Sequence, residues 1–553
     1  MSAVYAFLAK HKKFLLFAAV LFYLYFRGIG DHGLLDPLEG VNASVSLHML
    51  ASGHYFVPRI GESAVAGRSM GSWWLSALAL KIFGWWEFSV RFWPALAGIG
   101  MALAAAMASR RRPLLAAAVA ASMTLGFAAS QLSSSHALYA CCVGFAMTAF
   151  LRVSEIMNDD VSDSEWYGQW KWLLLAHIMP IMALIIHGPE GIILPWAALL
   201  AFSILVQRFS TLGECWAFWP GALISVFGTA GYFALLWLKN PVLLDFMRSE
   251  APKLIETDWR LTLLLLLAGT TPWQGFIAAA VKGTAANSMA DLRDGFSPSP
   301  SDTRKLFMIA WAVVFALAAI ITGDILALSA CVPAVSALVA ASLSEWLDAG
   351  NTESLRAASS ASALFLVPLV FVGIPLSIAS FPALRDAMMS LIPWGVFVLV
   401  FLIVVRRCAR GGKNALSTAR QYGLSRGTAA VALLCLMPLA GAFDLASDKM
   451  SLHEVGPALH KEVHENDVVA QYAINRPSLY FYTLHSSALV NGELLPGVAS
   501  KNLLMDDTAL HLLWTGADRV FLLMTPERRP ASPLPLDVYS VIDANGMSVV
   551  SNR

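Results

Sequence analysis

The sequence predicts a mainly α-helical, polytopic membrane helix bundle of about thirteen spans, followed by a small C-terminal α/β domain outside the membrane. Hydrophobic residues make up 57% of the chain and charged residues only 14%, with a mean hydropathy of +0.63. Soluble globular chains carry about 25% charged residues. The apolar residues gather in long stretches, and the composition becomes polar after residue 444. The missing charge is typical of a lipid-facing surface.

The apolar stretches fix the approximate positions of the spans, because a membrane helix needs about 20 mostly apolar residues. They lie near residues 14–26, 92–109, 113–130, 137–153, 171–187, 191–207, 217–238, 261–281, 306–322, 325–344, 360–380, 388–405 and 428–444. The shorter stretch 72–86 ends in two tryptophans, so we expect a helix lying at the membrane surface. No small-residue cleavage site follows the apolar start, which favours a retained signal anchor over a cleaved signal peptide.

Lysine and arginine set the orientation, because cytoplasmic loops are enriched in them. They cluster at Lys10, Lys12, Lys13, Arg110, Arg111, Arg112, Lys282, Arg304, Lys305, Arg406, Arg407, Arg410, Lys413, Arg420 and Arg426. With thirteen spans, all these clusters fall on one side. The sequence therefore predicts a multi-pass protein of the bacterial inner membrane with a cytoplasmic N-terminus and a periplasmic C-terminus. The outer side receives loops 28–91 and 239–260 and the tail.

The predicted domains are a transmembrane domain, residues 1–444 with the outer loop 28–91, and a periplasmic α/β domain, residues 445–553. In the tail, residues 468–472 and 519–524 are short apolar runs typical of strands. Residues 508–514 between them have helical spacing. Residues 538–551, which turn at an Asn-Gly pair, predict a β-hairpin.

Several function classes find no support. A net charge of +1 gives no reason to expect a nucleic-acid partner. No Walker A loop and no GxGxxG junction is present, which argues against nucleotide-fuelled transport. The 6 cysteines form no CxxC pair and none lies in the tail, so neither a zinc motif nor a disulfide framework is indicated. No outward DxD motif is present, and we expect neither a metal requirement nor a cofactor.

The first outer loop holds two carboxylates three positions apart, Asp36 and Glu39. If Pro37 begins a helix, Glu39 lies in its first turn and Asp36 at its cap. Two interpretations remain open. Asp36 is either only a helix cap, or part of a carboxylate pair at the membrane surface that accepts a proton from an incoming hydroxyl or phosphate.

Basic side chains follow in the outer loops. Arg59 and Arg68 flank Gly61–Gly67, a stretch that we expect to be flexible and able to fold over a headgroup. The planar guanidinium suits phosphate, although nonspecific contact with lipid headgroups is the alternative. The next outer loop adds Arg248 and Glu250.

Three further polar residues lie where predicted spans end on the outer side: His136, His187 and Asp324. A histidine there is either a satisfied interfacial residue or part of a site. A carboxylate in apolar surroundings such as Asp324 is a functional candidate by default.

The order of these features resembles the aminoarabinose transferase group of the GT-C glycosyltransferases, which modify lipid A, over nearly the whole chain. The family's D-P-D-E-x-R-Y and E-M-L-x-x-G-D-W-V-V-P-R-L segments are similar to Leu35–Asn42 and His48–Ile60 here. Other similar segments follow in the family's order: Arg68–Leu75 (K-P-P-L-x-Y-W-L), Leu80–Gly84 (F-K-x-F-G), His187–Pro189 (K-G-P), Arg248–Glu250 (R-E-H) and Thr271–Trp273 (L-P-W).

The sequence departs from the family pattern at key positions. The family's catalytic aspartate in the first loop aligns with Leu38, which leaves Asp36 and Glu39 as the nearby carboxylates. The aspartate of its T-L-D-M turn aligns with His136. The lysine of its K-L-P-x-Y motif falls near Leu326, close to Asp324. The family's lipid A specificity is therefore not carried over.

The resemblance implies a sugar on undecaprenyl phosphate as donor and a lipid or glycan of the outer leaflet as acceptor. It implies an inverting pentosyl or hexosyl transfer without a nucleotide. Glu39 or Asp36 would orient or deprotonate the acceptor. The donor phosphate would contact Arg59, Arg68, Arg248 and His187, and support for the acceptor would come from His136, Asp324, Asn42 and Glu250.

Two alternatives remain open. A catalytically degenerate relative that binds glycolipid would account for Leu38 and His136 in place of acids. A lipid or solute transporter would favour charges paired within the spans and repeated halves, and the sequence shows neither.

Overall fold

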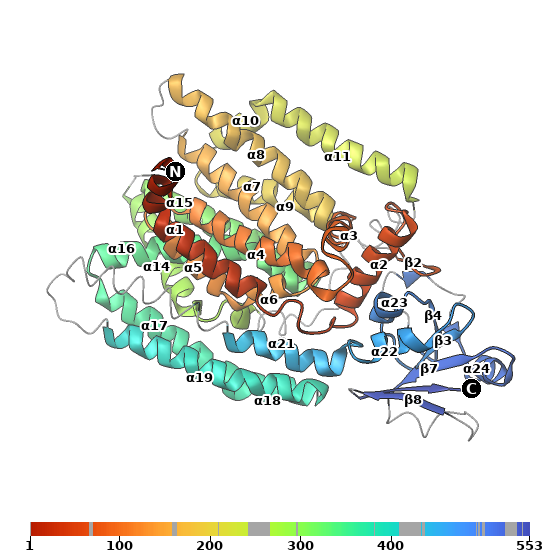
Figure 1. Ribbon diagram of the computed structural model, residues 1–553. Coiled ribbons are helices and arrows are strands. Elements are labelled where there is room, and N and C mark those ends of the chain that lie inside the picture. Colours follow the sequence, from red (N-terminus) through yellow and green to blue (C-terminus); the bar gives the residue numbers. More distant parts are fainter. Residues whose placement is uncertain are drawn as a thin grey trace. The chain divides into compact units, whose positions relative to one another are not determined.

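The computed structural model describes residues 2–65, 70–156, 163–207, 209–241, 266–294, 297–380, 382–408, 433, 437–493, 495, 498–499, 504–525, 539–544 and 546–553. Figure 1 gives the labels of its helices and strands. The chain divides into two units. The first comprises Met1–Arg27, Pro94–Tyr232 and Pro252–Gly441, and the second comprises Gly28–Trp93, Phe233–Ala251 and Ala442–Arg553.

The first unit is helical wherever it is described as regular structure. Its helices are α1 (Ser2–Phe26), α5 (Pro113–Ser122), α6 (Thr124–Gln131), α7 (His136–Ile156), α8 (Asp163–His187), α9 (Glu190–Leu205), α10 (Ser210–Ala217), α14 (Gln274–Arg293), α15 (Pro300–Thr322), η1 (Ile325–Cys331), α16 (Val332–Asp348), α17 (Thr352–Pro368), η2 (Leu369–Gly373), α18 (Ile374–Ser380), η3 (Pro382–Leu384) and α19 (Arg385–Cys408). The unit boundary falls within α4 (Glu87–Ala108), α11 (Trp219–Lys239) and α21 (Met437–Met450).

The predicted multi-pass helix bundle is confirmed. Among the described residues, 8 helices are long and apolar enough to cross a membrane, and α5 with α6 makes a ninth if this bent pair is one span. The eight agree with the predicted spans at 92–109, 137–153, 171–187, 217–238, 306–322, 325–344, 360–380 and 388–405. The predicted span 191–207 corresponds to α9, a shorter apolar helix. The stretch 14–26 lies in α1, and most of 428–444 lies outside the described residues.

Two predicted spans differ from straight helices. Residues 113–130 form two helices bent by 65°, because Met123 between them has an extended backbone. The prediction of one continuous span at 261–281 is wrong within its described part. The helical residues 266–269 are followed by a turn at 270–272, and α14 begins only at Gln274 and ends at Arg293. Proline lacks an N–H and disfavours helical geometry in the residue before it, so the interruption follows from Pro272.

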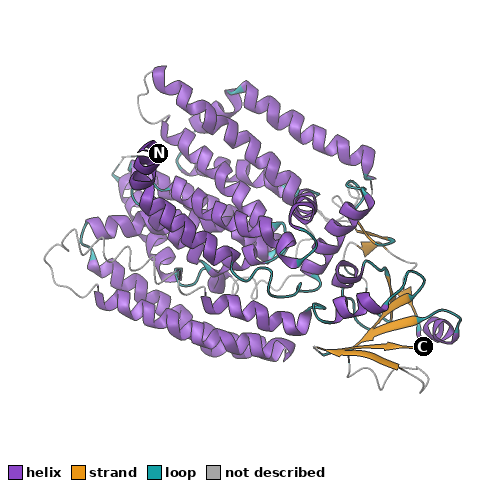
Figure 2. Cartoon of the chain, in the orientation of Figure 1, coloured by secondary structure: helices purple, strands orange, loops and turns teal. Residues whose placement is uncertain are grey.

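The second unit combines short helices with two sheets, whose strands Figure 2 shows in orange. Its helices are α2 (Leu38–Ser52), α3 (Gly71–Phe83), α22 (Val455–Glu462), α23 (Ser478–Thr483) and α24 (Asp507–Thr515). The small sheet has the order β1 (Arg59–Ile60), β2 (Ser63–Val65), β5 (Val498–Ala499). The large sheet has the order β6 (Leu504–Met505), β4 (Ser487–Val490), β3 (Val468–Tyr472), β7 (Val520–Met524), β9 (Met547–Ser551), β8 (Tyr539–Ala544).

The large sheet is parallel from β6 to β7 and ends in the antiparallel pair β9–β8. Alternate residues of β7 pack into two different cores, Phe521 and Leu523 on one face and Leu522 and Met524 on the other. Both faces are covered, which explains why the strand reads as a continuous apolar run rather than an alternating one. The strands, the helix and the hairpin predicted in the tail are all confirmed.

The outer loop folds together with the tail in this unit. Leu34, Leu47, Leu80 and Val90 share one hydrophobic core with Leu479 of α23 and with β3 and β7. The sequence prediction placed residues 28–91 with the transmembrane domain, whereas the structure groups 28–93 with 442–553. Helix α3 covers most of the predicted surface helix 72–86, and its 13 residues are too few to span a bilayer.

Candidate functional site

The centre of the second unit is a buried ion pair between Glu39 and Arg91. Arg91 Nε donates to Glu39 Oε1 at 2.8 Å and Nη2 donates to Oε2 at 2.7 Å, and neither side chain is exposed. The same guanidinium also donates to the carbonyls of Ile29, His32 and Gly33. Glu39 Oε2 accepts a further bond from the Leu35 N–H at 2.9 Å. The pair therefore ties the start of α4 to the loop before α2.

Asp36 is the second buried carboxylate, and its partner lies in the tail. The Ser478 N–H donates to Asp36 Oδ1 at 3.0 Å, and the Ser478 hydroxyl donates to Oδ2. The interpretation of Asp36 as the cap of α2 is wrong, because Pro37 holds the N-cap position of that helix. The carboxylate oxygens of Asp36 instead accept hydrogen bonds from Ser478. Glu39 does lie in the first turn, as predicted. Gly40 packs so closely on Asp36 and on the Ser478 nitrogen that a Cβ would collide with both.

Burial raises the pKa of Asp36 from 3.8 to about 7, although the bonds from Ser478 and the charge of Arg476 oppose this shift. A raised carboxyl pKa means that the folded chain binds the proton more tightly than the unfolded chain. The stabilisation from the tighter proton binding is complete below pH 3.8 and is lost as the pH rises through about 7.

The stability of the protein should therefore fall between pH 5 and pH 8 by more than it does in an Asp36→Asn variant. Thermal unfolding in detergent across this range measures the difference. Asp386→Asn, which removes an exposed carboxylate in the first unit, is the control and should keep the wild-type slope. Parallel profiles for wild type and Asp36→Asn would show that Asp36 does not titrate in this window.

Of the other predicted residues of the second unit, the structure describes Arg59 and Asn42. Arg59 lies in β1 and is exposed, unlike the two carboxylates. The Asn42 amide oxygen accepts a bond from the Trp73 indole N–H at 2.8 Å, which holds α3 against α2. The stretch 61–67 was expected to be flexible. Its described part forms the turn and the second strand of the β1–β2 hairpin, and β2 pairs in turn with β5. Arg68, Arg248 and Glu250 lie outside the described residues.

The first unit brings together three predicted residues, His136, His187 and Asp324, from three separate elements. His136 Nε2 lies 2.9 Å from Asp324 Oδ1, and His187 Nε2 lies 3.7 Å from Oδ2. His187 is buried, and the side chains of His136 and Asp324 are 12% and 15% exposed. The His187 ring stacks on Tyr139 at a centroid distance of 4.3 Å. The sequence placed each residue at the outer end of a span but did not predict that they meet.

Several side chains around the two carboxylates and around the His136–His187–Asp324 cluster were given no role in the sequence analysis. Arg91 is the main one. An arginine beside an apolar span is a detectable signal, since a buried charge needs a partner. Ser478, Ser135 and Tyr139 carry no comparable signal, because serine and tyrosine occur throughout such chains.

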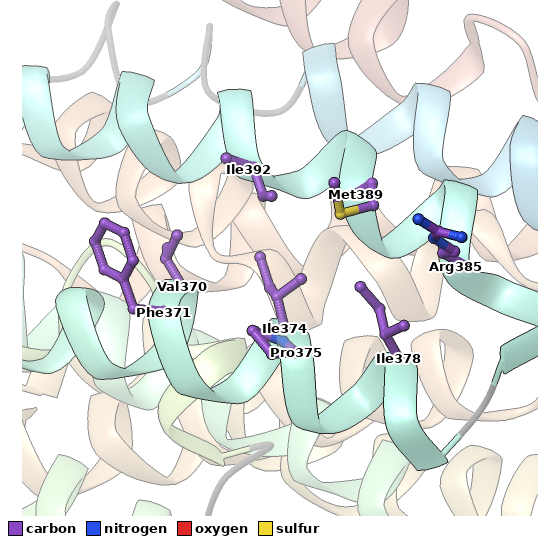
Figure 3. A pocket seen from close by; sticks show the side chains of 8 residues that line it. All are labelled: Val370, Phe371, Ile374, Pro375, Ile378, Arg385, Met389 and Ile392. Carbon is purple, nitrogen blue, oxygen red and sulfur yellow. The ribbon is translucent and has the colours of Figure 1, made fainter.

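A cavity of about 540 Å³ in the first unit is lined by residues other than the predicted ones. Figure 3 shows that its lining is apolar except for Arg385 at one end. It lies between the helical segment η2–α18 and α19, where Val370, Ile374 and Ile378 face Met389. An apolar lining of this kind supplies no acid, base or nucleophile.

Solved structures share this fold over almost the whole chain. The crystal structure of apo ArnT from Cupriavidus metallidurans is 18% identical, with a TM-score of 0.74 and coverage of 99% of this chain and 98% of ArnT. ArnT bound to undecaprenyl phosphate is also 18% identical, with a TM-score of 0.78 and coverage of 98% of both chains. The chain has the ArnT fold. The resemblance to GT-C glycosyltransferases is thereby confirmed at the level of the fold.

Comparisons of sequence alone give weaker matches than the comparison with the ArnT structures. A match of 26% identity over 231 residues relates the chain to an uncharacterized protein of Aquifex aeolicus (strain VF5). That match covers 40% of this chain and 43% of the relative, so the chain spans less than half the length of the curated protein it matches. No family model matches the sequence.

Proposed function

We propose that this protein is a membrane glycosyltransferase that moves a sugar from a polyprenyl-phosphate donor to a lipid or glycan acceptor. The observation that carries the proposal is the ArnT fold, because the ArnT structure matched over 98% of both chains is bound to undecaprenyl phosphate. We also propose that the reaction takes place at the outer face of a bacterial inner membrane. The distribution of lysine and arginine supports the orientation, with a cytoplasmic N-terminus and a periplasmic C-terminus.

The proposed reaction is a single inverting displacement. The acceptor oxygen bonds to the anomeric carbon of the sugar while the bond from that carbon to the phosphate oxygen breaks. The polyprenyl phosphate leaves with the electron pair, and the acceptor proton passes to the Asp36 carboxylate. A pKa of about 7 suits a general base at neutral pH, because it combines ionisation with affinity for the proton. Glu39 would hold the loop through Arg91 and so position Asp36.

Charge on the leaving phosphate needs cationic or hydrogen-bonding partners. We propose Arg59, Arg68, Arg248 and His187 for this role. The exposure of Arg59 in the β1–β2 hairpin supports its availability to a headgroup. We propose that Asn42, His136, Asp324 and Glu250 support the acceptor.

The proposal is tested with the full chain reconstituted in lipid nanodiscs. Undecaprenyl phosphate carrying a labelled pentose or hexose is the donor, and a bacterial envelope lipid extract is the acceptor. We expect a labelled glycolipid or glycan together with free undecaprenyl phosphate, and none with heat-denatured protein. A deletion strain should lack the same product by mass spectrometry of its envelope lipids. If no donor yields a product and the deletion strain keeps its lipid profile, the protein is not this transferase.

A second candidate is a relative that binds the glycolipid without reacting. Two observations favour it. Leu38, 40% exposed, stands at the family's aspartate position, and Glu39 is neutralised by Arg91. Saturable binding of the undecaprenyl-phosphate sugar to the nanodiscs, with no product after prolonged incubation, would distinguish this candidate from the transferase.

A further inference from the structure

The ends of three elements in the first unit meet at His136, His187 and Asp324. His136 begins α7, His187 ends α8, and Asp324 is the N-cap of η1. One ligand atom from each residue lies within 4.8 Å of the other two. Two imidazole nitrogens and a carboxylate oxygen form a donor set that binds first-row transition metals, zinc among them.

Hydrogen-bonding neighbours hold all three residues: serine hydroxyls contact the two histidines, and a backbone N–H contacts the aspartate. Ser135 Oγ lies 2.9 Å from His187 Nδ1, and Ser134 Oγ lies 3.2 Å from His136 Nδ1. Both imidazoles therefore present Nε2 to the same carboxylate. Asp324 Oδ1 also accepts from the Ala327 N–H at 3.3 Å, which holds the carboxylate at the start of η1. Partners of this kind on the second ring nitrogen are usual for metal-binding histidines, because they fix tautomer and ring orientation.

The spacing of the ligand atoms suits a small ion. Zinc bonds of about 2.0–2.1 Å to nitrogen and oxygen separate tetrahedral ligand atoms by about 3.3 Å. The separations of 2.9 Å and 3.7 Å between the histidine nitrogens and the carboxylate oxygens lie on either side of this value. The two histidine nitrogens lie within 4.8 Å of each other, so side-chain rotations that bring them to this spacing would place all three atoms around one ion.

We infer that His136, His187 and Asp324 bind one divalent ion of the zinc class. Three protein ligands leave one tetrahedral position for water or for an oxygen of a bound molecule. The partial exposure of His136 and Asp324 keeps one side of the cluster accessible. The three ligands were each predicted as candidate residues at the outer ends of spans, but they lie far apart along the chain and form no motif, so a shared metal site was not predicted. The same three residues are proposed above to contact the donor phosphate and the acceptor. The inference adds a bound ion at that place and rests on the geometry of the cluster alone.

Metal content tests the inference without any assay of transfer. The full chain, purified in detergent, is stripped with a chelator, titrated with Zn²⁺ or Co²⁺, passed through a desalting column and measured by elemental analysis. We expect about one ion per chain and the visible absorption of Co²⁺ bound through nitrogen and oxygen ligands. Zn²⁺ should also raise the Tm.

Variants assign the ion to these residues. His187→Ala and Asp324→Asn should each lower the retained metal at least about tenfold, since loss of one of three ligands removes much of the affinity. Asp324→Asn is nearly isosteric, so it remains informative if His187→Ala fails to fold. His177→Gln is the matched control. This buried histidine of the same unit contacts Ser225 Oγ and the Cys215 carbonyl and should leave the metal content unchanged.

The inference is overturned if the stripped wild-type chain takes up neither Zn²⁺ nor Co²⁺, since the cluster would then be a hydrogen-bonded His–Asp network. It is also overturned if monodisperse Asp324→Asn keeps the wild-type metal content. Failure of sugar transfer with intact metal binding would count against the proposed function alone.

Discussion

Replacing Arg91 by methionine should lower the free energy of unfolding by about 3–5 kcal/mol, because it leaves a buried carboxylate without its partner. Glu39 and Arg91 have no exposed surface, and the guanidinium also donates to three loop carbonyls. Methionine fills much of the arginine volume but supplies none of these donors. The lost hydrogen bonds are those that hold the loop carrying Asp36, so substrate binding should weaken as well.

Denaturant or thermal unfolding in detergent, followed by tryptophan fluorescence, measures this effect. Arg111→Met is the matched control, because Arg111 pairs with Asp348 where the two side chains are 62% and 45% exposed. A surface pair contributes about 0–1 kcal/mol. The double variant Glu39→Gln/Arg91→Met should recover part of the loss, because no charge is then left unpaired. An Arg91→Met protein as stable as Arg111→Met would show that the ion pair does not hold this loop.

Asp36→Asn should reduce sugar transfer by about 10²- to 10⁴-fold, the usual contribution of a general base. The amide keeps an oxygen that accepts from the Ser478 N–H, and the Ser478 hydroxyl can turn to accept from the amide nitrogen. The change therefore removes the base and retains most of the packing. Initial rates with a saturating undecaprenyl-phosphate sugar measure the loss.

Ser478→Ala is the control that separates chemistry from structure. It removes the hydroxyl bond to Asp36 and leaves the carboxylate in place. We expect a lower Tm, since one hydrogen bond to a charged group contributes about 1.5–3 kcal/mol to stability. The transfer rate should fall far less than in Asp36→Asn, because the base itself is kept. Folded Asp36→Asn with wild-type transfer would remove Asp36 from the mechanism. Ser478→Ala as inactive as Asp36→Asn would instead indicate a structural role for the contact.

The helix bundle and the tail strands could be predicted because their signals are local. The stretch 306–322 predicted α15, and the Asn-Gly turn at 545–546 predicted the β8–β9 hairpin. The helix break near Pro272 could also have been predicted, since proline interrupts a helix. The prediction of one span at 261–281 missed it because it relied on apolar composition alone.

The candidate site was predicted as a set of residues and not as an arrangement. Asp36 and Glu39 lie three positions apart, yet Ser478 holds one and Arg91 the other. Contacts between distant segments leave no periodic pattern in the sequence, so the partners of Asp36 and Glu39 could be identified only in the structure.

The sequence by itself determined that this chain is a multi-pass membrane protein with a polar outer loop and an α/β tail. The composition of a segment and the length of its apolar stretch decide whether it lies in lipid or in water, and both are properties of that segment alone. Only the tertiary structure decided that the outer loop packs with the tail and that Arg91 neutralises Glu39. It also decided that His136, His187 and Asp324 converge. These contacts join residues that are far apart along the chain, and their geometry exists only once the backbone has brought them together.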